Sequence, residues 1–376
     1  MDFLRLSLVL YFFKYINCLS LHKYGLYPRL DENNLNGHLT WYTIGTPSDF
    51  SSIKQKKITI RDNNYIIWRD NEKYYGIRDA CSHQGASFER GCINKDTISC
   101  PYHGYTFDSN GELKDIPQYD INCLTNTKID SFKVIEKGGF VYLNTIPNEE
   151  IIDDTCIWIE PEYYDKNQNY VILKKDFEHN AKFVSINSLD ICHIGFVHTF
   201  GNKKSPNPVV DSAIEKINDH PEHYKITYEY IAGEKSLVKK IYNFDKIIVE
   251  NEYVLPHTTV ARVKFGDYTS TILTQALPIS KFKTKLFVKA YRNYFYKNSE
   301  NEFLMRPLYE LINYIGDSIT KSTMETTLNQ DKVIIDSIDK TNYNLMHGKF
   351  SIKYDKLSNH YKNKYKSFYE SDINEF

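Results

Sequence analysis

Alternating apolar and polar residues, broken by turn signals, characterise the chain after its first forty residues. Segments 57–60, 65–68 and 74–77 are rich in β-branched and aromatic residues, with Asp and Asn between them, which predicts short strands. An Asn110-Gly111 pair predicts a hairpin over 107–113. The first set of strands should close near 138–143, so the pattern predicts a small antiparallel β-sandwich over 41–146.

Longer alternating runs follow and predict a second, larger sheet. Their period of two implies an antiparallel sheet with one buried face. The runs are 224–230, 247–254, 259–265, 271–277 and 286–291. A helical pattern follows over roughly 302–340, so we expect an α+β chain with a second domain over 147–376.

Residues 1–40 form an N-terminal extension with an apolar run at 6–13, between Arg5 and Lys14. The run is too short to span a bilayer. It fits a targeting peptide, with a poor cleavage site at 17–20, an amphipathic segment that contacts a membrane, or a terminal helix packed on the body.

Composition narrows the compartment and the partners. The chain has 376 residues, a net charge of −1 and no basic block, so we expect no nucleic-acid partner. Its seven cysteines are an odd number without tight spacing, which argues against a disulfide scaffold and for a reducing, cytoplasmic location.

Two pairs of cysteine and histidine carry the strongest chemical signal. Cys81-Ser82-His83 and Cys100-Pro101-Tyr102-His103 are separated by sixteen residues and read C-x-H and C-x-x-H. Zinc also binds cysteine and histidine pairs, but zinc modules usually group the cysteines before the histidines. A [2Fe–2S] cluster with two thiolates on one iron and two imidazoles on the other needs this set.

These loops resemble Rieske domains, including the flanking glycines Gly85 and Gly104. Rieske proteins of the respiratory chain carry an extra cysteine in each loop, where this chain has Ala86 and Tyr102. Tyr105 stands where those proteins place a serine that raises the potential. The resemblance therefore implies a low-potential cluster of the oxygenase type.

A second motif lies downstream and contains Asn187, Asp190, His193 and His198. On a helix ending near Gly195, Asp190 and His193 would share a face. Two histidines and one carboxylate can bind Fe(II) and leave positions open for O2 and substrate. Taken alone, the same residues could equally form a core pair or a surface pair.

The two motifs together resemble Rieske non-haem iron oxygenases of the aromatic-ring-hydroxylating alpha-subunit type. The resemblance implies that His193 and His198 are ligands of a mononuclear Fe(II). It implies that Asp190 is a bridging carboxylate that links a ligand histidine to a cluster histidine of the neighbouring subunit. Asn187 would lie near the iron.

The third iron ligand should be a carboxylate from the C-terminal helix. Asp331 is the preferred candidate because an acidic residue shortly before an apolar run, here 333–335, is how the family motif looks. Asp336 and Glu325 are the rivals, and each could be an ordinary helix charge.

The resemblance implies a helix-grip (START/Bet v 1-like) catalytic domain and a head-to-tail homotrimer. Electrons would come from a separate ferredoxin or NAD(P)H-dependent reductase, and O2 would hydroxylate, dihydroxylate, demethylate or desaturate a small apolar or aromatic molecule. The motif form is shared with the pheophorbide a oxygenase-like branch, whose C-terminal C-x-x-C is absent here. A Rieske electron carrier with a non-functional second iron site and a zinc-bound structural protein are the alternatives.

Overall fold

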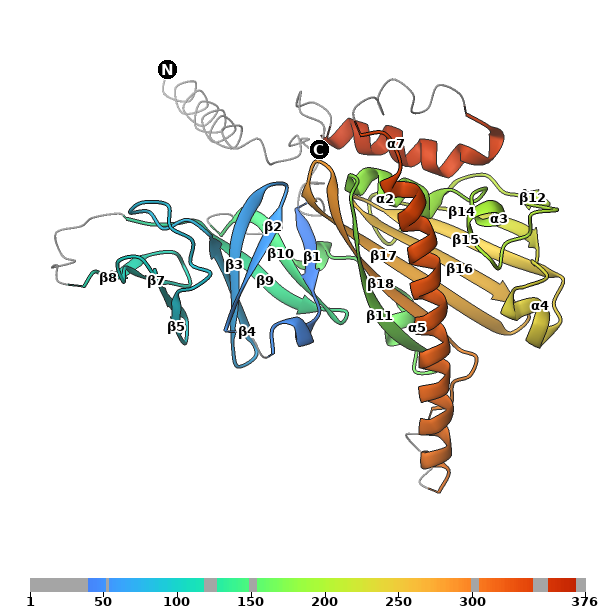
Figure 1. Cartoon of the computed structure of the whole chain (residues 1–376), viewed down its shortest axis with the longest axis horizontal. Helices are drawn as coiled ribbons and strands as arrows, with labels where there is room; N and C mark the ends of the chain where they lie inside the picture. Colours follow the sequence, from blue (N-terminus) through green and yellow to red (C-terminus); the bar gives the residue numbers. More distant parts are fainter. Residues whose placement is uncertain are drawn as a thin grey trace, which may run out of the picture.

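The computed structural model describes residues 40–51, 54–117, 127–148, 154–298, 304–340 and 351–369. Two β-rich parts lie side by side, and one long helix crosses the larger sheet (Figure 1). The predicted N-terminal extension, including the apolar run at 6–13, lies outside the described residues apart from Thr40.

The first part contains a six-stranded antiparallel sheet in the order β1-β10-β9-β4-β3-β2. Its strands are β1 (Trp41–Gly45), β2 (Gln55–Ile60), β3 (Asn63–Asp70), β4 (Lys73–Arg78), β9 (Ser131–Lys137) and β10 (Phe140–Pro147). A four-stranded sheet adjoins it, made of β5 (Cys92–Asn94), β6 (Thr97–Ser99), β7 (Thr106–Asp108) and β8 (Leu113–Asp115). The strands predicted in this part, and the turn at Asn110-Gly111, are confirmed.

The second part is an eight-stranded antiparallel sheet in the order β11-β18-β17-β16-β15-β14-β12, with β13 paired to β14. Its strands are β11 (Asn169–Phe177), β12 (Val210–Asp211), β13 (Glu215–Ile217), β14 (His223–Ile231), β15 (Lys246–Val254), β16 (Thr258–Phe265), β17 (Tyr268–Ser280) and β18 (Lys283–Arg292). All five alternating runs fall on these strands, so the predicted larger sheet is confirmed.

Helices cover one face of the larger sheet (Figure 1). They are α2 (Ala181–Leu189), α3 (Ile194–Val197), α4 (Leu237–Tyr242), α5 (Arg306–Asp336) and α7 (Lys356–Tyr369). Leu328 of α5 packs with apolar residues of α2, β11, β17 and β18. The helical prediction over 302–340 is confirmed by α5, whereas α7 was not predicted.

The prediction of one helix through Asp190 and His193 is wrong. The helix α2 ends at Leu189, and Asp190 has extended backbone angles (φ −78°, ψ 117°). The Asp190 carboxylate accepts a hydrogen bond from the N–H of Cys192 (2.8 Å). This local bond offers the backbone an alternative to the next helical turn, so the chain turns before α3 begins.

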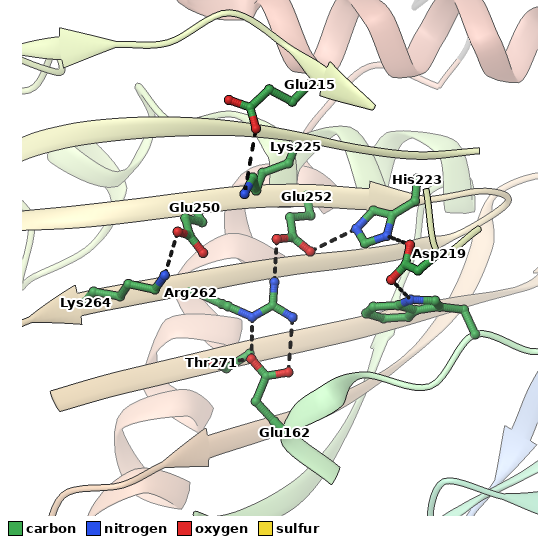
Figure 2. Close-up of polar contacts among 11 residues, drawn as sticks. Glu162, Glu215, Asp219, His223, Lys225, Glu250, Glu252, Arg262, Lys264 and Thr271 are labelled. Atoms are coloured by element: carbon green, nitrogen blue, oxygen red, sulfur yellow. Dashed lines mark hydrogen bonds and ion pairs between the residues drawn. The ribbon is translucent and has the colours of Figure 1, made fainter. Parts of the chain in front are cut away.

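Residues 154–168 form a connecting segment between the two sheets, and ion pairs hold it on the face of the larger sheet that does not carry α5 (Figure 2). Figure 2 shows Arg262 between Glu162 of the connecting segment and Glu252 of β15. His223 lies between Glu252 and Asp219, with nitrogen–oxygen distances of 2.9 and 2.6 Å. Burial raises the pKa of Glu252, but His223 and Arg262 outweigh it and lower that pKa overall. Alternating charges therefore hold the connecting segment against the sheet.

Both parts also share one hydrophobic core. Phe140 of β10 and Phe287 of β18 belong to the same buried cluster, with ring centroids 6.1 Å apart. At its edge, Lys289 donates to Glu160 (2.7 Å) and to the carbonyl of Gly138, and both charged residues are 1% exposed. A shared core and a buried ion pair make the two parts one packed unit.

Lys289→Met is expected to lower the free energy of unfolding by about 3–5 kcal/mol, because it leaves the Glu160 carboxylate buried without its cation. The measurement is the denaturation midpoint of the cluster-loaded protein. The double variant Lys289→Met/Glu160→Leu should recover most of the loss. Equal losses in the single and double variants would show that packing, not charge, matters at this position.

Candidate metal centres

The first candidate centre lies in the loops that precede and follow the β5–β6 hairpin. Cys81 and Cys100 are buried, whereas His83 and His103 are exposed. The two imidazole Nδ1 atoms are 3.1 Å apart. The set therefore offers two buried thiols and two converging imidazole nitrogens, as a cluster with two cysteine and two histidine ligands requires.

Both loops use the same backbone turn. The N–H of Gly85 donates to the carbonyl of Cys81 (2.7 Å), and the N–H of Gly104 donates to the carbonyl of Cys100 (2.9 Å). Gly85 and Gly104 have φ values of 72° and 76°, which a residue with a Cβ rarely adopts. Each glycine therefore lets its loop close and hold its cysteine and histidine on the same side.

Aromatic rings flank the histidines. Tyr105 stacks on His83 with ring centroids 4.7 Å apart and an interplanar angle of 11°, and Tyr102 lies 3.8 Å from His103. Burial raises the pKa of the Cys81 thiol, and the neighbouring Cys100 thiol adds to the rise. Two thiols this close and this buried suit a bound metal better than two free thiolates.

The second candidate centre brings together His193, His198 and Asp331, whose ligand atoms all lie within 4.8 Å of one another. The two Nε2 atoms are 3.2 Å apart, and they lie 3.4 and 3.5 Å from Asp331 Oδ1. Ligand atoms about 2.1 Å from one metal ion and at right angles to each other are about 3 Å apart. The three atoms therefore form a nearly equilateral face that fits one divalent ion.

The Asp331 carboxylate fits the role of a metal ligand. Its Oδ1 atom is buried and has no hydrogen-bond partner among the described residues. An unpaired buried carboxylate oxygen is costly, and a metal ion would satisfy it. The residues thus fit the mononuclear Fe(II) that the resemblance implies.

The hydrogen-bond partner of Nδ1 sets the tautomer of each histidine. His193 Nδ1 lies 2.6 Å from the main-chain carbonyl of Asp190, and His198 Nδ1 lies 3.1 Å from Gln330 Oε1. Both partners are acceptors, so each Nδ1 carries the proton and each Nε2 keeps its lone pair for a metal. Gln330 was missed from the sequence, where its only signal is its place directly before Asp331.

The pKa values of the two imidazoles shift in opposite directions. Burial lowers the pKa of His193, but the Asp331 carboxylate more than compensates and raises it overall. Burial also lowers the pKa of His198, and the nearby His193 adds to this effect, so that pKa stays below its ordinary value. His198 is therefore the more readily neutral of the two, as a metal ligand must be.

The remaining predicted residues lie around this face. The Asp190 carboxylate is 39% exposed and 4.0 Å from His193 Nδ1, so His193 is held by the main chain rather than by that carboxylate. Asn187 is half-buried in α2. Asp336 pairs with Lys332 instead, and Glu325 is exposed. Of the three carboxylate candidates, only Asp331 reaches the histidines.

No helix in the part of the chain that the structure describes is long and apolar enough to cross a membrane.

Comparisons with known proteins agree with the first centre. Residues 40–132 match the family model described as a Rieske [2Fe–2S] domain. The oxygenase component of 3-ketosteroid-9-alpha-monooxygenase from Rhodococcus rhodochrous is 26% identical over 42% of this chain and 41% of the relative. Chlorophyllide a oxygenase of Arabidopsis thaliana is 25% identical over 42% of this chain and 28% of the relative. The chain thus spans less than half the length of these relatives.

Solved structures share the fold over most of the chain. A Pseudomonas putida NdmA variant with theobromine superposes with a TM-score of 0.65, at 17% identity, over 89% of this chain and 91% of that one. Dicamba monooxygenase bound to dicamba gives a TM-score of 0.67, at 16% identity, over 88% and 96%. The chain therefore contains a Rieske [2Fe–2S] domain, and its sequence relatives and structural neighbours are Rieske non-haem iron oxygenases.

Proposed function

We propose that this chain is the oxygenase component of a Rieske non-haem iron oxygenase system. The observation that carries the proposal is the face of His193, His198 and Asp331, whose ligand atoms are 3.2–3.5 Å apart in a chain that also has the Rieske loops. A Rieske electron carrier would have no use for a buried Asp331 oxygen that faces two imidazole nitrogens and accepts no hydrogen bond among the described residues. We propose residues 41–146 and 147–376 as its two domains.

Each group in the site has a defined task. Cys81, His83, Cys100 and His103 would hold the cluster, and the triad would hold Fe(II), which supplies open coordination positions for O2 and substrate. The carbonyl of Asp190 and the amide of Gln330 keep both triad imidazoles in the tautomer that leaves Nε2 unprotonated. The protein thereby supplies a preformed ligand face with a single negative charge.

Electron delivery would use a second copy of the chain. The cluster loops lie in the part of the molecule that faces away from α2 and α3 in Figure 1. The shared core and the Lys289–Glu160 pair hold that separation fixed. We therefore propose a head-to-tail homotrimer in which the half-exposed Asp190 carboxylate faces a cluster histidine of the neighbouring copy.

The names of the sequence relatives support a proposal for the substrate class. These include a ketosteroid monooxygenase, a methylxanthine N1-demethylase and a dehydrodivanillate O-demethylase. We propose a small apolar or aromatic substrate that is hydroxylated or demethylated. We propose that a separate ferredoxin or NAD(P)H-dependent reductase supplies the electrons.

The test is metal analysis of anaerobically purified protein, followed by single turnover. About three irons and about two acid-labile sulfides per chain, with a Rieske-type EPR signal, would support the proposal. The reduced protein should then convert a panel member to a hydroxylated or demethylated product under O2. Only about two irons per chain after Fe(II) addition would favour a Rieske electron carrier. A chain that contains zinc alone would contradict both the oxygenase and the electron carrier.

A further inference from the structure

Within one turn of α5, two side chains face strand β11 and two face the histidines of the second candidate centre. Asn329 and Lys332 face β11, where Lys175 donates to the Asn329 amide oxygen and Lys332 Nζ donates to the carbonyl of Asp176 (2.7 Å). The two residues between them, Gln330 and Asp331, face the histidines. The strand thus fixes the rotation of α5 about its own axis, and this rotation decides where both inner side chains point.

The amide of Gln330 meets a ring that has little freedom. His198 is 5% exposed and stacks on Phe200 with centroids 5.1 Å apart and an interplanar angle of 16°. Its Nδ1 lies 3.1 Å from Gln330 Oε1. The stacking restrains the plane of the ring, whereas the hydrogen bond decides which of its two nitrogens is protonated.

We propose that Gln330 is a positioning residue for the metal face, an inference that rests on the proposed function. It keeps the proton of His198 on Nδ1 and turns Nε2 toward Asp331. His193 needs no such side chain, because the main-chain carbonyl of Asp190 does the same for it. Since α5 supplies both Asp331 and Gln330, one helix sets one ligand directly and a second ligand through its hydrogen bond.

The choice of an amide has a consequence for charge. Histidine ligands commonly donate their second N–H to a carboxylate or a carbonyl, and a carboxylate increases the basicity of the ring. Gln330 accepts the same hydrogen bond without adding a second negative charge beside Asp331. The ligand face therefore keeps Asp331 as its one carboxylate, which suits a divalent ion that must retain open positions.

The experiment compares three variants of the full chain. Gln330→Met keeps the length of the side chain and removes the acceptor, whereas Gln330→Glu keeps an acceptor. Glu325→Gln is the matched control, because it changes an exposed side chain of the same helix and leaves the contacts of Asn329 and Lys332 with β11 unchanged. The readouts are the Fe(II) dissociation constant, from competition with a chelator, and the visible spectrum of the Co(II)-substituted site.

Gln330→Met is expected to weaken Fe(II) binding by about 10–100-fold and to alter the Co(II) spectrum. Gln330→Glu should bind Fe(II) within a few-fold of the parent, and Glu325→Gln should match the parent in both readouts. The Rieske EPR signal reports that each variant has folded.

Wild-type affinity in Gln330→Met would overturn the inference and leave the proposed function standing. Equal weakening in Gln330→Met and Gln330→Glu would also overturn it, because the side chain would then act by packing alone. A parent chain that binds neither Fe(II) nor Co(II) would instead overturn the proposed function, and this inference with it.

Discussion

Asp331→Ala is expected to abolish binding of the mononuclear iron and substrate turnover while the [2Fe–2S] cluster remains. Asp331 Oδ1 lies 3.4 and 3.5 Å from the two imidazole nitrogens and is the carboxylate corner of the face. Without it, two neutral imidazoles remain, too few ligands to hold Fe(II) firmly. Iron per chain should fall from about three to about two, and turnover should fall by at least about 10³-fold.

Glu325→Gln is the control, because it removes an exposed carboxylate from the same helix. It should keep the iron content and turnover of the parent. The Rieske EPR signal should be the same in all three proteins, because the cluster loops are far from α5 in the fold (Figure 1). Retention of the third iron in Asp331→Ala would contradict the assignment and direct attention to Asp336.

Asp190→Asn is expected to slow electron delivery to the iron by about 10²-fold with both metal centres still loaded. The substitution is conservative for the backbone, because an asparagine oxygen can still accept the hydrogen bond from Cys192 that ends α2. The main-chain carbonyl that orients His193 is also unchanged. What is lost is the negative charge of a half-exposed carboxylate beside the site.

The measurement is the rate at which O2 reoxidises the reduced cluster in a single turnover with substrate bound. Metal content, EPR signal and oligomeric state serve as controls and should match the parent. Asn187→Ala, three residues earlier on α2, tests whether any polar change near the site has the same effect. A parent-like rate in Asp190→Asn would show that electrons do not need this carboxylate.

Local patterns were enough to predict the strands and the first centre. Period-two alternation depends only on which side of a strand each residue faces, so β14 to β18 could be recognised one at a time. The Rieske loops are equally local, because each cysteine lies two or three residues from its histidine and a glycine closes each turn. The pair His193 and His198 could be proposed as ligands for the same reason.

The end of α2 before Asp190 shows where prediction from local sequence patterns failed. A spacing of three residues between Asp190 and His193 suits a helix. Instead, the Asp190 carboxylate accepts a hydrogen bond from the N–H of Cys192, and α2 ends at Leu189. Helix periodicity and a side-chain turn compete for the same backbone groups, and periodicity alone does not show which of them prevails.

Only the tertiary structure separated the three candidates for the third ligand, revealed the amide of Gln330 beside His198 and showed how the two β-rich parts join. A resemblance to the family motif favoured Asp331 over Asp336 and Glu325, and the rotation of α5 against β11 turns Asp331 alone of the three toward the histidines. Gln330 and His198 are 132 residues apart in the sequence. Lys289 and Glu160 are 129 residues apart. Such contacts depend on how the helices and strands pack against one another. The spacing and composition of a short segment of the chain therefore do not predict them.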